Sequence, residues 1–95
     1  MKDINNYRIL LNELLQQEIN LWLNYQENLN ERRAIIEILQ NNLFLNQPLT
    51  NLKRQQFRDS LISLNNIIQQ NEFHLTQVKY NIFKIRELLE GEPEI

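Results

Sequence analysis

Residues 57–89, FRDSLISLNNIIQQNEFHLTQVKYNIFKIRELL, decide the fold. Counting alternately by four and three from Phe57 reaches ten positions, nine of them apolar: Phe57, Leu61, Leu64, Ile68, Asn71, Leu75, Val78, Ile82, Ile85 and Leu89. This spacing is typical of a coiled-coil seam, the row of side chains with which one helix faces another. A strand would alternate apolar and polar residues with a period of two, and this stretch does not.

An earlier stretch of the chain has the same spacing. Counting from Leu11 gives Leu11, Leu15, Glu18, Trp22, Tyr25, Leu29, Arg32, Ile36, Leu39 and Leu43. Glu18 and Arg32 are the polar members of this seam, as Asn71 is of the other. We expect Trp22 and Tyr25 to lie in the core. Two seams of this length predict an all-α fold built from two long helices.

Breaks in the chain set the expected ends of the helices. The residue before Pro48 is biased away from the α conformation, so one helix should end shortly before it. Either Pro48 or Thr50 can start the next helix, and Asp3 can cap the first one. Gly91 is expected to follow the last helical residue. The expected elements are a helix at about residues 4–45, a turn at about 46–50 and a helix at about 50–90, with helix propensity poor at 28–30.

A short connection makes the two helices antiparallel neighbours, in which the numbers of facing residues should add up to about 95. The expected fold is a single domain, residues 1–95, formed by an antiparallel two-helix coiled-coil hairpin. More apolar surface is present than one seam can bury, and exposed stripes of this kind mark interfaces. We therefore expect the hairpin to dimerise into a four-helix bundle or to bind another protein. The expected interface residues are Ile9, Leu23 and Ile38, with Ala34 beside them, on the first helix and Ile62, Phe73, Tyr80 and Phe83 on the second.

The polar residues of the seams have two interpretations each. Asn71 fixes the register of the helices, or it contacts a ligand or partner. Asn71 should lie near Trp22 and Tyr25. Glu18 and Arg32 reach to the edge of the seam, or Glu18 of one chain meets Arg32 of another in an antiparallel homodimer crossing near Tyr25.

Expected neighbours of the charged seam residues follow from the same register. Glu18 should face residues 77–78, and Arg32 should lie near Ser63 with Asp59 one turn away. His74 is a packed or solvent-facing residue, because no second His or Cys can join it in a metal site.

Composition excludes several classes of protein. The chain has 95 residues, no Cys, one His, one Gly and a net charge of −2. Thiolate or multi-histidine metal sites and glycine-rich phosphate loops cannot be built from it. We expect no enzymatic activity, no cofactor and no metal, and we find no signal peptide or membrane span, which makes the cytoplasm the default compartment. The charge balance disfavours nucleic-acid binding, although Arg32, Arg33, Lys53, Arg54 and Arg58 gather near the turn.

The chain resembles the small helical chaperones of flagellar type III export. The resemblance lies in residues 7–39, YRILLNELLQQEINLWLNYQENLNERRAIIEIL, and residues 64–89, LNNIIQQNEFHLTQVKYNIFKIRELL. Members of that family are usually longer, often have another helix and are often richer in charge. The resemblance implies binding of an amphipathic segment of an export substrate, without catalysis or a cofactor, in a groove formed by Phe73, Tyr80 and Phe83.

Three functions follow as hypotheses. The first is a chaperone-like or adaptor-like module that binds a partner helix through an apolar stripe. The second is a structural or assembly protein whose stripe binds a second copy of the chain. The third is a small RNA-binding regulator that uses the basic residues near the turn.

Overall fold

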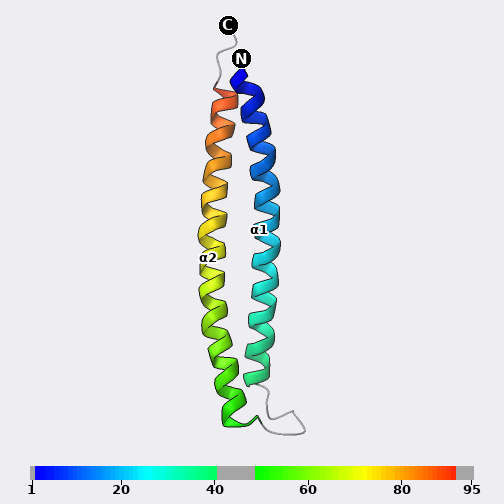
Figure 1. Ribbon diagram of the computed structural model, residues 1–95, viewed down its shortest axis with the longest axis vertical. Helices are drawn as coiled ribbons and strands as arrows, with labels where there is room; N and C mark the ends of the chain where they lie inside the picture. Colours follow the sequence, from blue (N-terminus) through cyan, green and yellow to red (C-terminus); the bar gives the residue numbers. More distant parts are fainter. Residues whose placement is uncertain (1, 41–48, 92–95) are drawn as a thin grey trace.

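The computed structural model describes residues 2–40 and 49–91 and forms two α-helices, α1 (Lys2–Gln40) and α2 (Asn51–Glu90). The helices lie side by side and antiparallel, so that the start of α1 and the end of α2 are at the same end of the molecule (Figure 1). The molecule is a rod of 73 × 18 × 15 Å. The described residues contain no strand. The all-α helical hairpin that the two seams predict is confirmed.

The structure changes the start of α1. The helix already includes Lys2, so Asp3 lies inside it and the prediction that Asp3 is its N-cap is wrong. The helix continues without a break through residues 28–30, despite their poor helix propensity. Packing against α2 along the whole rod outweighs that local preference. The expected end of this helix near Leu45, and the seam residue Leu43, lie outside the described residues.

Both ends of α2 agree with the sequence signals. Thr50 is the N-cap, and its side-chain oxygen accepts a hydrogen bond from the Lys53 backbone N–H at 3.2 Å. Gly91 follows the last helical residue and donates its N–H to the Glu87 carbonyl at 2.7 Å. Gly91 has a right-handed conformation (φ −83°), so it is not needed for a left-handed turn. A Cβ there would lie 2.9 Å from the Glu87 carbonyl oxygen, and this close approach favours glycine.

The predicted seam of α2 is confirmed at every position. All ten residues from Phe57 to Leu89 are buried or half-buried, and Ile68 is the most enclosed of them at 2% exposure. Arg54, one step before Phe57 in the same count, is half-buried as well.

The predicted seam of α1 is confirmed at every described position except Trp22. Leu11, Glu18, Tyr25, Arg32 and Leu39 face α2 as expected. Leu15 and Leu29 pack against the core clusters as expected, and Ile36 is half-buried. The residues one position earlier, Leu14, Leu21, Asn28 and Ile35, face α2 as well. Trp22 is 48% exposed, so the prediction that it lies in the core is wrong. Two rows of residues, one position apart, therefore compete for the seam. The row Leu15, Trp22, Leu29 and Ile36 is wholly apolar, whereas the row Leu14, Leu21, Asn28 and Ile35 contains an Asn.

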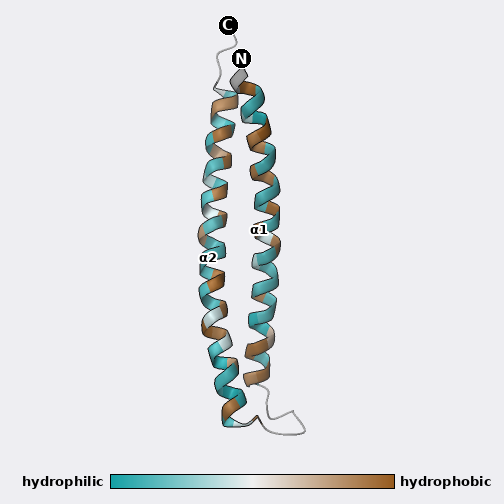
Figure 2. Cartoon of the chain, in the orientation of Figure 1, coloured by the Kyte–Doolittle hydropathy of each residue, from teal (hydrophilic) through white to brown (hydrophobic). Residues whose placement is uncertain are grey.

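Two apolar clusters form the core, one towards each end of the rod. The cluster near the termini contains the buried Leu14, Val78, Ile82 and Ile85. The cluster near the turn contains the buried Ile35, Leu64 and Ile68, with Tyr25 and Leu29 packed against it. Hydrophobic residues also lie along the outward edges of both helices, as Figure 2 shows. Within residues 2–40 and 49–91, neither helix combines the length and the apolarity that crossing a membrane requires.

Candidate interaction surfaces

A polar layer joins the helices near the middle of the rod. Asn28 donates its side-chain N–H to the Asn71 side-chain oxygen at 2.8 Å, and this pair is partly buried. On the same stretch the Tyr25 hydroxyl donates to the Glu72 carboxylate at 3.0 Å. These contacts satisfy polar groups that the seam would otherwise leave without partners. Asn71 therefore acts within the hairpin.

The polar layer corrects the predicted register. The numbers of hydrogen-bonded residues across the hairpin add up to 97 to 99 instead of about 95. The expected register placed Asn71 near Trp22 and Tyr25. In the structure Asn71 faces Asn28 instead. Arg32 donates from Nη1 to the Asn65 side-chain oxygen at 3.2 Å, and not to Asp59, whose carboxylate accepts from Gln55.

The contact with Glu72 raises the pKa of Tyr25 above its usual value of 10.0. The largest cause is the hydrogen bond, because the phenol can donate it only while protonated. Desolvation and the negative charge of Glu72 act in the same direction, whereas the positive charge of Arg32 opposes them.

One side of the hairpin carries an apolar groove near the termini, which we call the Trp22 groove. Its α1 wall contains Leu15, Ile19, Trp22 and Leu23, and its α2 wall contains Ile82 and Phe83. Three charged residues, Glu18, Lys79 and Arg86, lie among them. Glu18 is half-buried and lies beside Lys79, so it faces about residue 79 instead of the expected 77–78.

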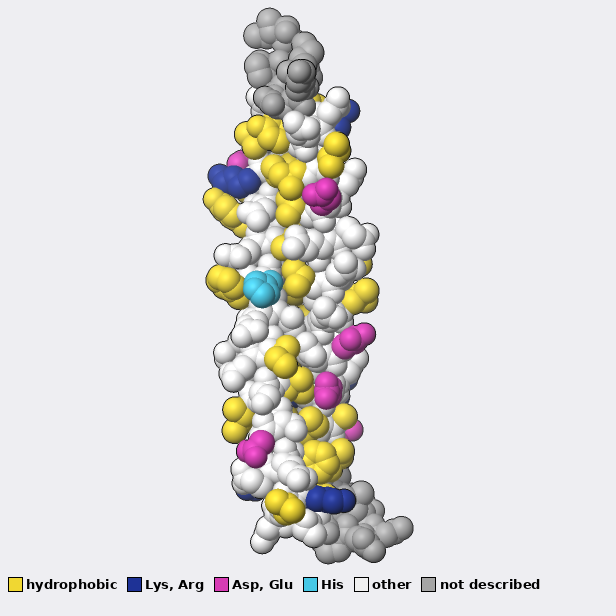
Figure 3. Space-filling model, viewed as in Figure 1, with side chains coloured by type: hydrophobic (Ala, Val, Ile, Leu, Met, Phe, Trp, Pro, Cys, Tyr) yellow, Lys and Arg dark blue, Asp and Glu magenta, His cyan; other side chains and the backbone are white. Residues whose placement is uncertain are grey.

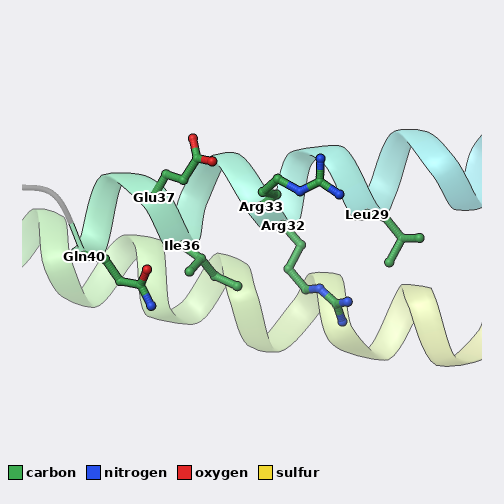
Figure 4. Close-up of a pocket in the computed structure, with 6 residues that line it drawn as sticks. All are labelled: Leu29, Arg32, Arg33, Ile36, Glu37 and Gln40. Carbon is green, nitrogen blue, oxygen red and sulfur yellow. The ribbon is translucent and has the colours of Figure 1, made fainter.

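The Trp22 groove belongs to a longer feature of α1. Leu15, Trp22, Leu29 and Ile36 are spaced by seven residues, so they form a straight row along the helix beside the seam, here called the second row. Towards the turn the row passes a shallow depression lined by Leu29, Arg32, Arg33, Ile36, Glu37 and Gln40. In Figure 4 the Arg32 side chain points towards α2, whereas Arg33 points away from it.

A second surface lies on α2 and borders the Trp22 groove at Phe83, and we call it the outer stripe. It consists of Ile62, Phe73, Tyr80 and Phe83, each more than half exposed, as the sequence predicts. Lys84 lies with its ammonium 5.6 Å from the centre of the Tyr80 ring and pairs with Glu87 at 3.5 Å. The rings of Phe73 and His74 are 6.0 Å apart. Three aromatic rings on one exposed side of a helix are typical of a protein interface.

The remaining interface candidates lie on α1. Ile9 and Leu23 are more than half exposed, on the side of α1 that faces away from α2. Ile38 is half-buried beside the seam, so it is less open than expected. Ala34 is exposed.

Side chains that could support other chemistry are scattered. His74 is exposed on one face of the rod, where Figure 3 shows the histidine with hydrophobic side chains beside it. In the described part of the chain, no group of three or more His, Cys, Asp or Glu side chains is placed to hold a metal ion. Arg33, Arg54 and Arg58 near the turn end are interspersed with Glu31, Glu37 and Asp59, which weakens a basic patch.

Sequence reasoning missed two features of this surface. The first is the exposure of Trp22, which the spacing places in the seam although its row lies at the side of the hairpin. The second is Asn28, which was noted only as a weak helix former. Two rows of α1, one residue apart, could form the seam, and only one of them contains an Asn. Matching that Asn28 to Asn71, the polar residue of the α2 seam, would have predicted the pair. Comparisons of the chain with family models, with curated proteins and with solved structures gave no match.

Proposed function

We propose that this chain is a non-enzymatic protein-interaction module of the chaperone or adaptor kind. Its outer stripe would bind an amphipathic helix of a partner protein, by analogy with an export substrate held in the cytoplasm. The observation that carries this proposal is the outer stripe itself, because Phe73, Tyr80 and Phe83 expose aromatic rings that the hairpin does not use. Aromatic side chains contribute more to binding energy than most other residues.

The amount of exposed surface supports a binding role. The chain exposes 7765 Å², whereas a compact monomer of its 11.6 kDa would expose about 5,800 Å². Among the described residues, twelve large hydrophobic side chains are exposed and eight are buried. A hairpin with more large apolar residues outside than inside gains stability by covering them with another protein.

Site-specific photocrosslinking in the source cells tests the proposal. A photoreactive phenylalanine analogue at Tyr80 should give an adduct with one defined protein, because Tyr80 lies at the centre of the outer stripe. The matched control is the analogue at Asn81, which is equally exposed but faces the side lined by Gln17 and His74. The adduct should disappear when Phe73→Ser is added. Equal labelling at both positions, or adducts with the chain itself only, would contradict a partner helix on this stripe.

A structural or assembly role is the second candidate, and the second row of α1 favours it. That row is apolar at four positions, three heptad steps in length, and lies at the side of the hairpin. It is separate from Phe73 and Tyr80, so self-association there would leave these two rings of the outer stripe free for a partner, whereas Phe83 borders the groove.

A further inference from the structure

We infer that the second row of α1 binds a second copy of this chain, with the two α1 helices antiparallel. Trp22 of each copy packs on Leu29 of the other, and Glu18 of each copy meets Arg33 of the other. This goes beyond the proposed function, because it uses α1 while the partner helix is assigned to α2. Each can therefore fail without the other.

The spacing of the surface calls for a helix as its occupant. Next to the second row, on the side away from α2, lie Ile19, Gln26 and Arg33. Taken together the two rows run Leu15, Ile19, Trp22, Gln26, Leu29, Arg33 and Ile36, with steps alternating between four and three. This is a second coiled-coil seam on the same helix, rotated from the first. Helices with such a widened apolar face occur in bundles, in which each helix packs against two neighbours.

The charges of this surface are self-complementary. Glu18 precedes Trp22 by four residues, and Arg33 follows Leu29 by four residues. An antiparallel pairing that places Trp22 on Leu29 therefore also places Glu18 opposite Arg33, at both ends of the contact. Among the described residues the ion pair that forms is Lys84–Glu87, so neither Glu18 nor Arg33 forms one within the hairpin.

The structure also selects Arg33 over Arg32 as the partner of Glu18. Arg32 points towards α2 and donates a hydrogen bond to Asn65, so it already acts within the hairpin. Arg33 is exposed, points away from α2 and lies beside Leu29 and Ile36. The Glu18–Arg32 contact that the sequence suggests is thereby replaced.

The surface is large enough for this contact. The chain exposes about 1,900 Å² more than a compact monomer of its size. A specific interface of standard size covers about 800 Å² of each partner. The excess is larger than the area that such an interface covers on each copy.

Solution mass across a concentration series is the first test. The wild-type chain should be a dimer at micromolar concentration, and Trp22→Ala should weaken it about thirtyfold or more. Tyr80→Ala is the matched control, since it removes an aromatic ring of similar exposure from the outer stripe and should leave the dimer unchanged. Arg33→Glu should weaken the dimer about tenfold, and adding Glu18→Arg should restore it. The double variant Arg32→Glu with Glu18→Arg should not restore the dimer, because Arg32 acts within the hairpin. Circular dichroism of each variant verifies that the hairpin is intact.

Cysteine crosslinking tests the orientation, and the natural absence of Cys makes each introduced thiol unique. In the antiparallel dimer Gln26 lies on the two-fold axis, so Gln26→Cys should form a disulfide with its own copy. Asn12→Cys and Gln40→Cys should crosslink with each other and not with themselves. A disulfide between two copies of Asn12→Cys would show a parallel dimer, and a monomeric wild type at 100 µM would show no dimer. Either result would overturn the inference.

Discussion

Asn28 and Asn71 join the two helices by a side-chain hydrogen bond of 2.8 Å, between two apolar clusters. Each residue is the polar member of an otherwise apolar row, and the rows meet in only one register. A slip of one heptad would place each amide against an apolar side chain. The pair therefore selects the register at some cost in stability.

The Asn28–Asn71 pair can be tested by a double-mutant cycle. Asn28→Leu or Asn71→Leu alone should lower the free energy of unfolding by about 1 kcal/mol, because the remaining amide loses its partner in a partly buried position. The double Leu variant should be at least as stable as the wild type, since both polar groups are then replaced by apolar ones. Urea unfolding measures all four proteins. Asn66→Leu, on the exposed side of α2, is the control and should change little. Additive losses in the double variant would show that the two amides are not coupled.

Tyr25 makes stability depend on alkaline pH. Its pKa is raised because its hydroxyl donates to Glu72, so folding favours the protonated phenol. The resulting stabilisation is complete below the usual pKa of 10.0 and is lost as the pH rises through the raised value. Wild type should therefore exceed Tyr25→Phe in unfolding free energy at about pH 8, and the difference should shrink above pH 10. Urea unfolding at several pH values measures it. Parallel pH profiles of the two proteins would contradict the contact.

Thr50 defines the start of α2 through its side-chain hydrogen bond to the Lys53 backbone N–H. Thr50→Ala should lower the unfolding free energy by about 1 kcal/mol, because that N–H loses its acceptor. Thr50→Asp should retain the stability of the wild type, since a carboxylate accepts the same bond and favours a helix N-terminus. Chemical unfolding of the three proteins is the measurement. If both variants lost the same free energy of unfolding, the Thr50 methyl group would be the stabilising feature and the side-chain hydrogen bond would not.

Most of the fold could be predicted from the sequence, because each local signal acts over one or two helical turns. The α2 seam is the clearest case, since only one phase of that helix is apolar. Thr50 and Gly91 end the helix through bonds to residues three or four positions away. Asp3 lies inside α1 because a residue that can cap a helix does not oblige the helix to start there.

The surfaces of α1 could not be assigned in the same way. Leu14–Leu15, Leu21–Trp22 and Ile35–Ile36 give two apolar rows, and the helix alone contains nothing that ranks them. The choice is made across the hairpin, by Asn28 meeting Asn71. For the same reason the outer stripe was predictable: its residues lie far from the only seam that α2 offers.

Two adjacent isoleucines of α2 test how the core is distributed. Ile68 is 2% exposed in the cluster near the turn, whereas Ile67 is 44% exposed beside the seam. Ile68→Ala should lower the unfolding free energy by about 2–3 kcal/mol, since it removes buried methyl groups and leaves a cavity. Ile67→Ala should cost about 0.5 kcal/mol or less. The two variants have the same composition, so urea unfolding isolates burial as the cause. Similar losses would mean that Ile67 is also covered, for example by another chain.

Trp22 reports directly on whether the second row is covered. It is the only Trp of the chain and is 48% exposed in the hairpin. Iodide should therefore quench its fluorescence well at high dilution, where the hairpin is alone. If a second copy packs on the second row, quenching should fall as the protein concentration rises, with the same midpoint as the change in solution mass. Arg33→Glu should move both midpoints to higher concentration, because it weakens the contact without removing the fluorophore. Strong quenching that is independent of concentration, in a protein of dimeric mass, would place the dimer contact on another face of the hairpin.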